Sequence, residues 1–146
     1  MEINIKLSQE EDFDQIFELL KQLWPNQSLD KLAMEQIYLK GLRSNNQTYL
    51  VAATKDYKII GFASLYIKNN LWQCGNLSHI DELIVDQDYR KKGIATLLLN
   101  KIIVEAKKND CKRVELDSAF HREAAHEFYK RKGFENRAYL FSKNIT

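Results

Sequence analysis

A basic turn at residues 90–96 carries the residue types best suited to hold an anion. Arg90, Lys91 and Lys92 stand directly before Gly93, and apolar residues then recur at helical spacing through Ala106. Backbone N–H groups in the first turn of a helix lack intrahelical partners, and the helix dipole adds positive potential there. Because glycine has no side chain, a phosphate oxygen can approach the backbone closely at this position. The spacing predicts a phosphate-binding helix start, with a basic surface turn before a core helix as the alternative.

The elements before this turn are predicted from hydrophobic periodicity. Residues 3–7 alternate as a strand, and a capping box at Ser8-Gln9-Glu10-Glu11 begins a helix that Pro25 ends after Trp24. Ser28 is the predicted cap of a second helix. The residues expected on the buried faces of these two helices are Phe13, Ile16, Phe17, Leu20 and Leu23, then Leu29, Leu32, Ala33, Ile37 and Leu42.

A hairpin and a strand–helix–strand unit follow. Residues 47–54 and 59–67 read as two strands around a turn, a polar loop begins at 68–70, and residues 77–85 form a fourth strand. After the basic turn we expect a helix to about Lys108, a strand at 113–118 and a helix that ends at Gly133. A final antiparallel pair is expected at 134–137 and 138–142. Parallel pairing across the third helix then predicts one mixed α/β domain over residues 1–146.

Composition narrows the class of protein. The chain has 146 residues, 45% hydrophobic and 29% charged, with a net charge of +2, which is too small to indicate a nucleic-acid binder. No apolar run of transmembrane length and no signal-peptide core occur, so we expect a cytoplasmic protein without a membrane partner. Cys74 and Cys111 form no Cys-x-x-Cys pair. His79, His121 and His126 lack a metal-ligand spacing, so no metal is expected.

The turn also resembles a known family signature. Arg90-x-x-Gly93-x-Ala95 after an apolar strand is similar to the acyl-CoA pyrophosphate motif of the GNAT superfamily of N-acetyltransferases. A second string, from Ala125 through Phe128-Tyr129 to Gly133-Phe134, resembles the other hallmark of that family, one strand–helix unit further on. The order of elements agrees over about residues 2–143. The resemblance implies the GNAT fold, a mostly antiparallel mixed sheet with parallel, splayed fourth and fifth strands and about four flanking helices.

A narrower similarity points to aminoalkylphosphonate N-acetyltransferases. It rests on Glu82-Leu83, Arg122, Ala125-His126, Phe128-Tyr129 and the ending Phe141-Ser142-Lys143. Many family members carry Asn where this chain has Arg122, which puts a side-chain contact to CoA at that position in doubt.

The resemblance implies that acetyl-CoA is the cosubstrate and that an amine receives the acetyl group. The pyrophosphate is expected on the basic turn, against Arg90 and the N–H groups of residues 91–96. The pantetheine arm is expected along the backbone of 83–85, an exposed strand edge whose polar groups need partners. The N–H of Val85 is a candidate donor to the thioester carbonyl. The cofactor-binding residues are therefore Leu83, Ile84, Val85, Arg90, Lys91, Lys92, Gly93, Ile94, Ala95 and Thr96.

Three side chains are candidates for acid–base chemistry. Glu82 lies on a strand expected to be covered on both faces, so it is the candidate base, directly or through water; a structural ion pair is its alternative. Strand alternation places Asp81 on the opposite face. His79 is the second candidate base. Tyr129 resembles the family's general acid, with helix packing as its alternative role.

The acceptor site is less clearly indicated. Candidate substrate contacts are Trp24, Tyr38, Trp72, Asp81, Arg122, His126 and Tyr139, of which Arg122 and His126 suit an anionic acceptor. We expect a small-molecule amine of aminoalkylphosphonate, aminoglycoside or polyamine type, and allow a homodimer. The alternatives are a protein N-terminal or lysine acetyltransferase, a non-catalytic acyl-CoA-binding or regulatory module, and a nucleotide-phosphate binder, which no Walker or Gly-x-Gly-x-x-Gly motif supports.

Overall fold

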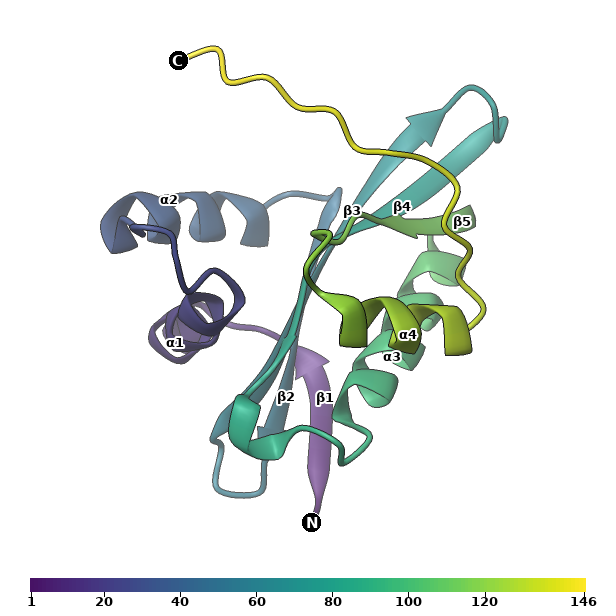
Figure 1. Ribbon diagram of the computed structural model, residues 1–146. Coiled ribbons are helices and arrows are strands. Elements are labelled where there is room, and N and C mark those ends of the chain that lie inside the picture. Colours follow the sequence, from purple (N-terminus) through teal and green to yellow (C-terminus); the bar gives the residue numbers. More distant parts are fainter. The chain divides into compact units, whose positions relative to one another are not determined.

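The computed structural model describes residues 1–146 and contains one five-stranded sheet in the order β1-β2-β3-β4-β5. The strands are β1 (Ile3–Leu7), β2 (Gln47–Thr54), β3 (Ile59–Asn70), β4 (Gly75–Val85) and β5 (Cys111–Leu116), and the helices are α1 (Phe13–Leu23), α2 (Lys31–Leu42), α3 (Ile94–Lys108) and α4 (Glu123–Arg131). Strands β1 to β4 pair antiparallel, whereas β5 runs parallel to β4 (Figure 1). The mixed α/β sheet predicted from the sequence is confirmed.

The chain divides into two compact units, residues 1–115 and 116–146. In the first unit, α1 and α2 lie on one face of the sheet and α3 lies on the other (Figure 1). The second unit holds α4 and the C-terminal segment.

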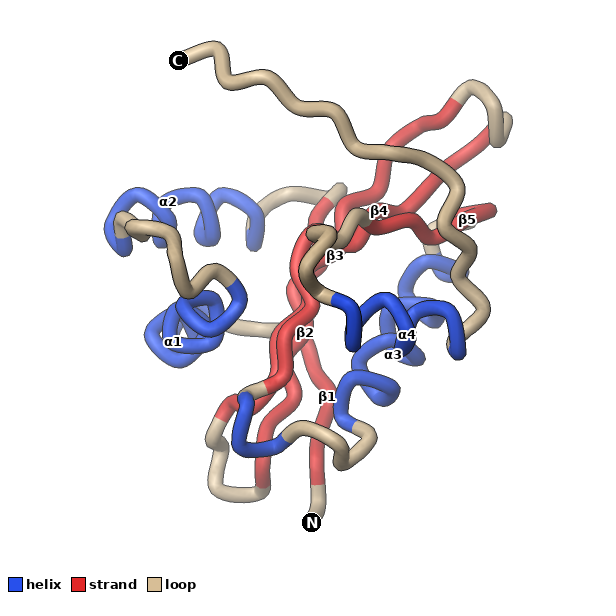
Figure 2. The backbone as a smooth tube through the Cα atoms, in the orientation of Figure 1, coloured by secondary structure: helices blue, strands red, loops and turns tan.

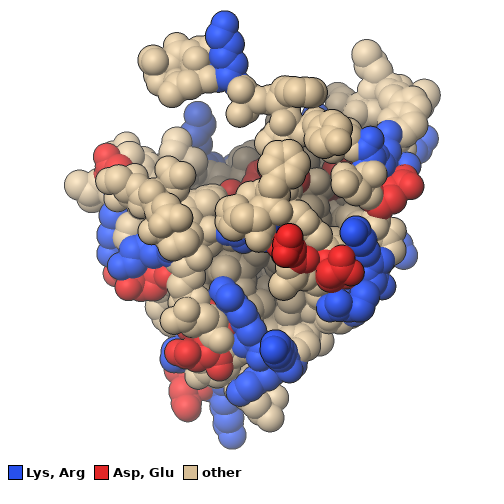
Figure 3. All heavy atoms as spheres, in the orientation of Figure 1, with Lys and Arg blue, Asp and Glu red and all other residues tan.

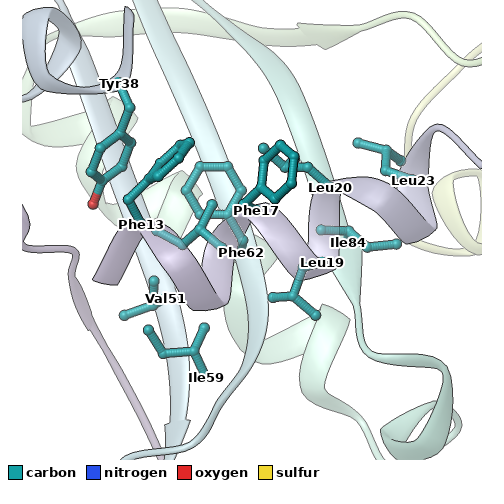
Figure 4. Packing of buried hydrophobic residues seen from close by; sticks show 11 residues of the cluster. Phe13, Phe17, Leu19, Leu20, Leu23, Tyr38, Val51, Ile59, Phe62 and Ile84 are labelled. Carbon is teal, nitrogen blue, oxygen red and sulfur yellow. The ribbon is translucent and has the colours of Figure 1, made fainter. Parts of the chain in front are cut away.

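The core of the first unit forms where α1 packs on the sheet (Figure 4). All five predicted apolar positions of α1 are buried. They contact β2, β3 and β4 through Val51, Phe62 and Ile84. On the opposite face, Gly61 of β3 lies against Leu98 of α3, so successive residues of β3 serve the two helical layers.

The start of α1 differs from the predicted capping box by one residue. A short 3-10 turn, η1 (Glu10–Asp12), precedes the helix, and Gln9 rather than Ser8 is its cap. The Gln9 N–H donates to the Asp12 carboxylate at 2.8 Å. The Ser8 hydroxyl is instead 2.9 Å from the Tyr38 hydroxyl, which also donates to the Gln9 carbonyl at 2.6 Å. Asp12, and not Glu11, supplies the acceptor because η1 turns the carboxylate back toward Gln9.

The predicted cap and buried face of α2 are wrong in part. Asp30, not Ser28, accepts the Ala33 N–H at 3.1 Å and caps the helix. Leu29 and Leu42 do pack on the core, but Ala33 is exposed, and Leu32 and Ile37 are 74% and 65% exposed.

Tyr38 and Gly41 decide which face α2 buries. The Tyr38 ring stacks on Tyr49 of β2 with 5.1 Å between centroids. A Cβ at Gly41 would overlap the Tyr49 phenol, so this glycine permits the close approach of helix and strand. Aromatic stacking outweighs the aliphatic stripe that the sequence pattern favoured.

The β3–β4 hairpin is longer than predicted (Figure 2). Residues 68–70 continue β3 and pair with Leu77, Asn76 and Gly75, so the polar loop begins at Leu71. Cross-strand pairing extends a strand through residues whose own β-propensity is low. Strand β5 likewise begins two residues before the predicted 113–118.

The predicted final antiparallel pair is not formed. Residues 134–146 contain no helix or strand (Figure 2), and Leu140 and Phe141 are 70% and 90% exposed. A two-stranded hairpin without a further strand or helix to pack on is marginally stable. The alternating pattern of residues 134–142 is therefore not enough by itself to form the predicted hairpin.

Candidate active site

A β-bulge in β4 organises the first group of predicted site residues. Ser64 of β3 pairs with Glu82, but the next residue, Leu65, pairs with Ile80, so Asp81 is the extra residue. A bulge interrupts the alternation of side chains along a strand. His79 shares the face of Glu82, because its partner Tyr66 lies two residues from Ser64 on β3.

The bulge corrects the predicted orientation of Asp81. Its carboxylate lies 2.9 Å from Nδ1 of His79 and therefore joins the His79 and Glu82 face instead of pointing away. Burial first, and then the negative charges of Glu82 and Asp81, raise the pKa of the Tyr49 phenol on β2. Two carboxylates thus concentrate negative potential on the face that α1 and α2 cover.

The Glu82 carboxylate is held by a residue that the sequence analysis missed. Oγ of Ser64 donates to Oε1 of Glu82 at 2.6 Å and accepts the Glu82 N–H at 3.1 Å. Only the pairing register revealed Ser64, since a single serine in an apolar strand carries no motif of its own.

The backbone after Glu82 has polar groups on both edges. The Asp86 N–H donates to the Ile60 carbonyl at 2.8 Å, which makes Val85 and Gly61 a pair without hydrogen bonds between them. The N–H and C=O of Val85, and by alternation those of Leu83, therefore point away from β3. The Val85 carbonyl accepts a hydrogen bond from the Nε–H of Arg90, with 3.1 Å between nitrogen and oxygen. Ile84 directs its backbone groups toward β3 and its side chain into the core. Unlike Leu83 and Val85, it therefore has no backbone N–H or C=O directed away from β3 with which to bind the pantetheine arm.

The basic turn has the geometry of an anion cradle. It follows the short 3-10 turn η2 (Gln87–Tyr89), and Lys91 and Gly93 both have positive φ, 61° and 80°. Helix α3 begins at Ile94, and its first intrahelical donor is Leu97, which bonds to the Gly93 carbonyl at 3.1 Å. The N–H groups of residues 94–96 thus have no partner within the helix. A Cβ placed on Gly93 would meet no atom within 4 Å, so the space in front of the turn is open to a ligand.

Gly93→Ala should weaken acetyl-CoA binding about 10-fold, because a methyl group enters the cradle and the left-handed backbone becomes strained. Isothermal titration with acetyl-CoA measures this loss. Gly133→Ala is the matched control, since Gly133 also has positive φ, 91°, and open space at its Cβ. It should share the loss of melting temperature and keep the parent affinity. Equal affinities for all three proteins would contradict the cradle.

The second unit contains the other predicted groups. The Tyr129 ring packs edge-on against Phe128 and Phe134, with centroids 5.5 and 5.7 Å away. Burial raises the pKa of the Tyr129 phenol, and the positive charge of Arg122 partly opposes that shift. Nε2 of His126 donates to the Ala119 carbonyl at 2.9 Å, so this histidine stabilises the loop before α4.

The remaining predicted substrate contacts are spread along the chain. Tyr38 is a core residue, and Trp24 at the end of α1 packs against the same core. Trp72 lies in the β3–β4 turn, where the Arg113 guanidinium stands 5.4 Å from its ring centroid. Tyr139 is exposed in the C-terminal segment. Glu82 belongs to the first unit and Tyr129 to the second, so their joint action stays a prediction.

Comparison with known proteins identifies the family to which this domain belongs. The model of the acetyltransferase (GNAT) family matches residues 13–134. The chain therefore belongs to the GNAT family, and the predicted class of N-acetyltransferase is confirmed.

Three relatives of this chain are also named as N-acetyltransferases. An aminoalkylphosphonate N-acetyltransferase of Salmonella typhimurium is 29% identical over 92% of this chain and 86% of its own length. An uncharacterized N-acetyltransferase of Methanocaldococcus jannaschii is 35% identical over 68% of this chain, which spans 45% of that relative's length. A glucosamine 6-phosphate N-acetyltransferase of Trypanosoma brucei is 26% identical over 92% of this chain and 90% of its own length.

Solved structures share the fold at low identity. One described as a transcriptional regulator from Bacillus halodurans has a TM-score of 0.90 at 19% identity, covering 99% of this chain and 100% of that one. An aminoglycoside antibiotic 6'-N-acetyltransferase from Acinetobacter baumannii has a TM-score of 0.83 at 23% identity, again covering 99% and 100%.

Two further observations concern the length of the helices and the distribution of surface charge. None of the helices combines the length and the apolar character needed to cross a bilayer. Basic and acidic side chains occur side by side on the face shown in Figure 3.

Proposed function

We propose that this protein transfers an acetyl group from acetyl-CoA to the amine of a small molecule. The observation that carries the proposal is the pair of carboxylates, Asp81 and Glu82, brought to one face of β4 by the bulge. They stand directly before the strand end at Leu83 to Val85 and the anion cradle of the basic turn. An ammonium substrate is attracted to such a face, and a carboxylate there can accept its proton.

Loss of that proton is the first requirement of the reaction. An alkyl amine resembles lysine, whose pKa is about 10.4, so the neutral form at pH 7 costs roughly 4–5 kcal/mol. Glu82 accepts the proton, directly or through one water. Asp81 helps to hold the ammonium form as it arrives.

The cradle and the strand end hold the donor. The N–H groups of residues 91–96 and the charge of Arg90 bind the pyrophosphate. Leu83 and Val85 pair with the pantetheine arm, and the Val85 N–H polarises the thioester carbonyl. The neutral amine adds to the thioester carbonyl. When the resulting tetrahedral intermediate collapses, the C–S bond breaks, Tyr129 donates a hydrogen bond and then a proton to the departing sulfur, and the second proton lost from the amine nitrogen restores the phenol.

The names of the relatives support a small amine as the acceptor. Their names specify an aminoalkylphosphonate, glucosamine 6-phosphate and, for a structural neighbour, an aminoglycoside, all of which are small amines. Two of these three also carry an anionic group, for which Arg122 is the candidate partner. We therefore propose a small amine, with aminoalkylphosphonates, amino sugar phosphates and aminoglycosides as the first substrates to test.

The experiment follows CoA release from acetyl-CoA with a thiol reagent across a panel of amines. The panel contains those three groups, polyamines, amino acids and short peptides with free N-termini or lysines. We expect release at least 10-fold above hydrolysis with one group of small amines. Release with peptides alone would identify a protein acetyltransferase instead. Tight acetyl-CoA binding without release for any amine would favour a non-catalytic acyl-CoA-binding module.

A further inference from the structure

We propose that Ser64 is a positioning residue that holds the Glu82 carboxylate in its reactive orientation and in its ionised form. The inference rests on the proposed role of Glu82 as the base. Ser64 lies on β3, between β2 and β4, and its side chain is buried at 1% exposure. A hydroxyl buried to this degree in an apolar strand needs hydrogen-bond partners, and both of the bonds described for it go to Glu82.

One hydroxyl fixes two parts of the same residue. Its hydrogen is directed to Oε1 of Glu82 at 2.6 Å, a distance typical of a hydrogen bond to a charged oxygen. Its lone pair accepts the backbone N–H of Glu82 at 3.1 Å. The main chain and the carboxylate are therefore tied to one rigid strand, which restricts the rotamers of Glu82.

The bulge explains why a side chain supplies this bond. The register of β3 and β4 shifts between Ser64 and Leu65, at the level of Asp81. A bulge disrupts the regular ladder locally, and the Glu82 N–H bonds to a side-chain oxygen there. The same bulge brings Asp81 beside Glu82. A donor to the carboxylate offsets the repulsion between the two negative charges and favours the ionised form of Glu82.

Ser64→Ala tests the proposal, with Ser78→Ala as a matched control. Ser78 is equally buried, at 0% exposure on β4, but its hydroxyl donates to the Arg113 carbonyl at 3.3 Å. We expect Ser64→Ala to lower kcat about 10-fold and to leave the KM for acetyl-CoA unchanged, because both lost bonds hold Glu82, which is assigned to the amine and not to acetyl-CoA. Ser64→Thr keeps the hydroxyl and should recover most of the rate. Ser78→Ala should keep the parent kcat.

The pH profile separates positioning from general packing. Without the serine donor, the pKa of Glu82 should rise, so the acid limb of kcat/KM should move to higher pH in Ser64→Ala and not in Ser78→Ala. Other groups on this face can titrate as well. They are Tyr38 from α2, Tyr49 from β2, Tyr66 from β3, and His79 and Asp81 from β4. All of them are unchanged in Ser64→Ala, so a shift between the two proteins reports the Ser64 bond.

A double-mutant cycle tests whether Ser64 acts through Glu82 or independently of it. If Ser64 acts through Glu82, adding Ser64→Ala to Glu82→Gln should lower kcat less than twofold further. A full and independent loss in the Gln background would overturn the proposal and leave Ser64 a structural residue, with the role of Glu82 intact. If Glu82→Gln alone left the rate unchanged, the proposed function of Glu82 would fail first.

Discussion

Glu82→Gln should lower kcat/KM for the amine about 100- to 1,000-fold near neutral pH. The substitution keeps the size of the side chain and its ability to accept the Ser64 hydrogen bond, but an amide cannot take a proton from an ammonium ion. General-base catalysis by a positioned side chain typically contributes a factor of about 100 to 10,000. The loss is expected in kcat and in kcat/KM for the amine, and the affinity for acetyl-CoA should be unchanged.

The pH dependence makes this expectation specific. As the pH approaches the pKa of an alkyl amine, about 10.4, the substrate loses its proton without help, so the ratio of parent to variant should fall steadily. Steady-state rates from pH 6 to 10 measure this ratio. Glu18→Gln on the exposed side of α1 is the control and should match the parent throughout. A variant profile parallel to that of the parent over the whole range would make Glu82 structural.

Tyr129→Phe should lower kcat about 10- to 100-fold with little change in acetyl-CoA affinity. The phenylalanine retains the ring that packs against Phe128 and Phe134 and removes only the hydroxyl that donates to the CoA sulfur. Because burial raises the pKa of this phenol, its neutral, donating form persists above pH 10. The activity of the parent should therefore show no decline from Tyr129 ionisation below that pH.

The companion variant Tyr129→Leu distinguishes chemistry from packing. If Tyr129 is the acid, the Phe and Leu variants should lose similar factors in kcat, while only the Leu variant loses stability in thermal melting. If the residue serves packing, Tyr129→Phe should keep the parent rate and Tyr129→Leu alone should be impaired. Single-turnover measurement of CoA release is the appropriate assay, since product release then cannot mask the chemical step.

Much of this molecule is determined by short stretches of its sequence. The basic turn needs a glycine with positive φ, basic neighbours and a helix that begins at once, and all three are encoded within residues 90–97. The apolar face of α1 and the β2–β3 turn are equally local, because periodicity and turn residues act over a few positions. For these elements the sequence pattern and the structure agree.

The details around Glu82 depend on residues far apart in the chain. Sequence alternation placed Asp81 on the wrong face, because a bulge arises from the register between β3 and β4 and not from β4 alone. Ser64 is 18 residues from Glu82, and a lone serine has no pattern that could have indicated it.

The buried face of α2 is also decided by residues that are far apart in the chain. Tyr49 and Gly41 set it through a contact between strand and helix, against an aliphatic stripe that pointed elsewhere. The sequence by itself therefore determined the helices and strands up to α4, the geometry of the basic turn and the family, since each depends on neighbouring residues. Only the tertiary structure decided which side chains stand beside the candidate base, because pairing register and helix packing bring together residues that share no local pattern.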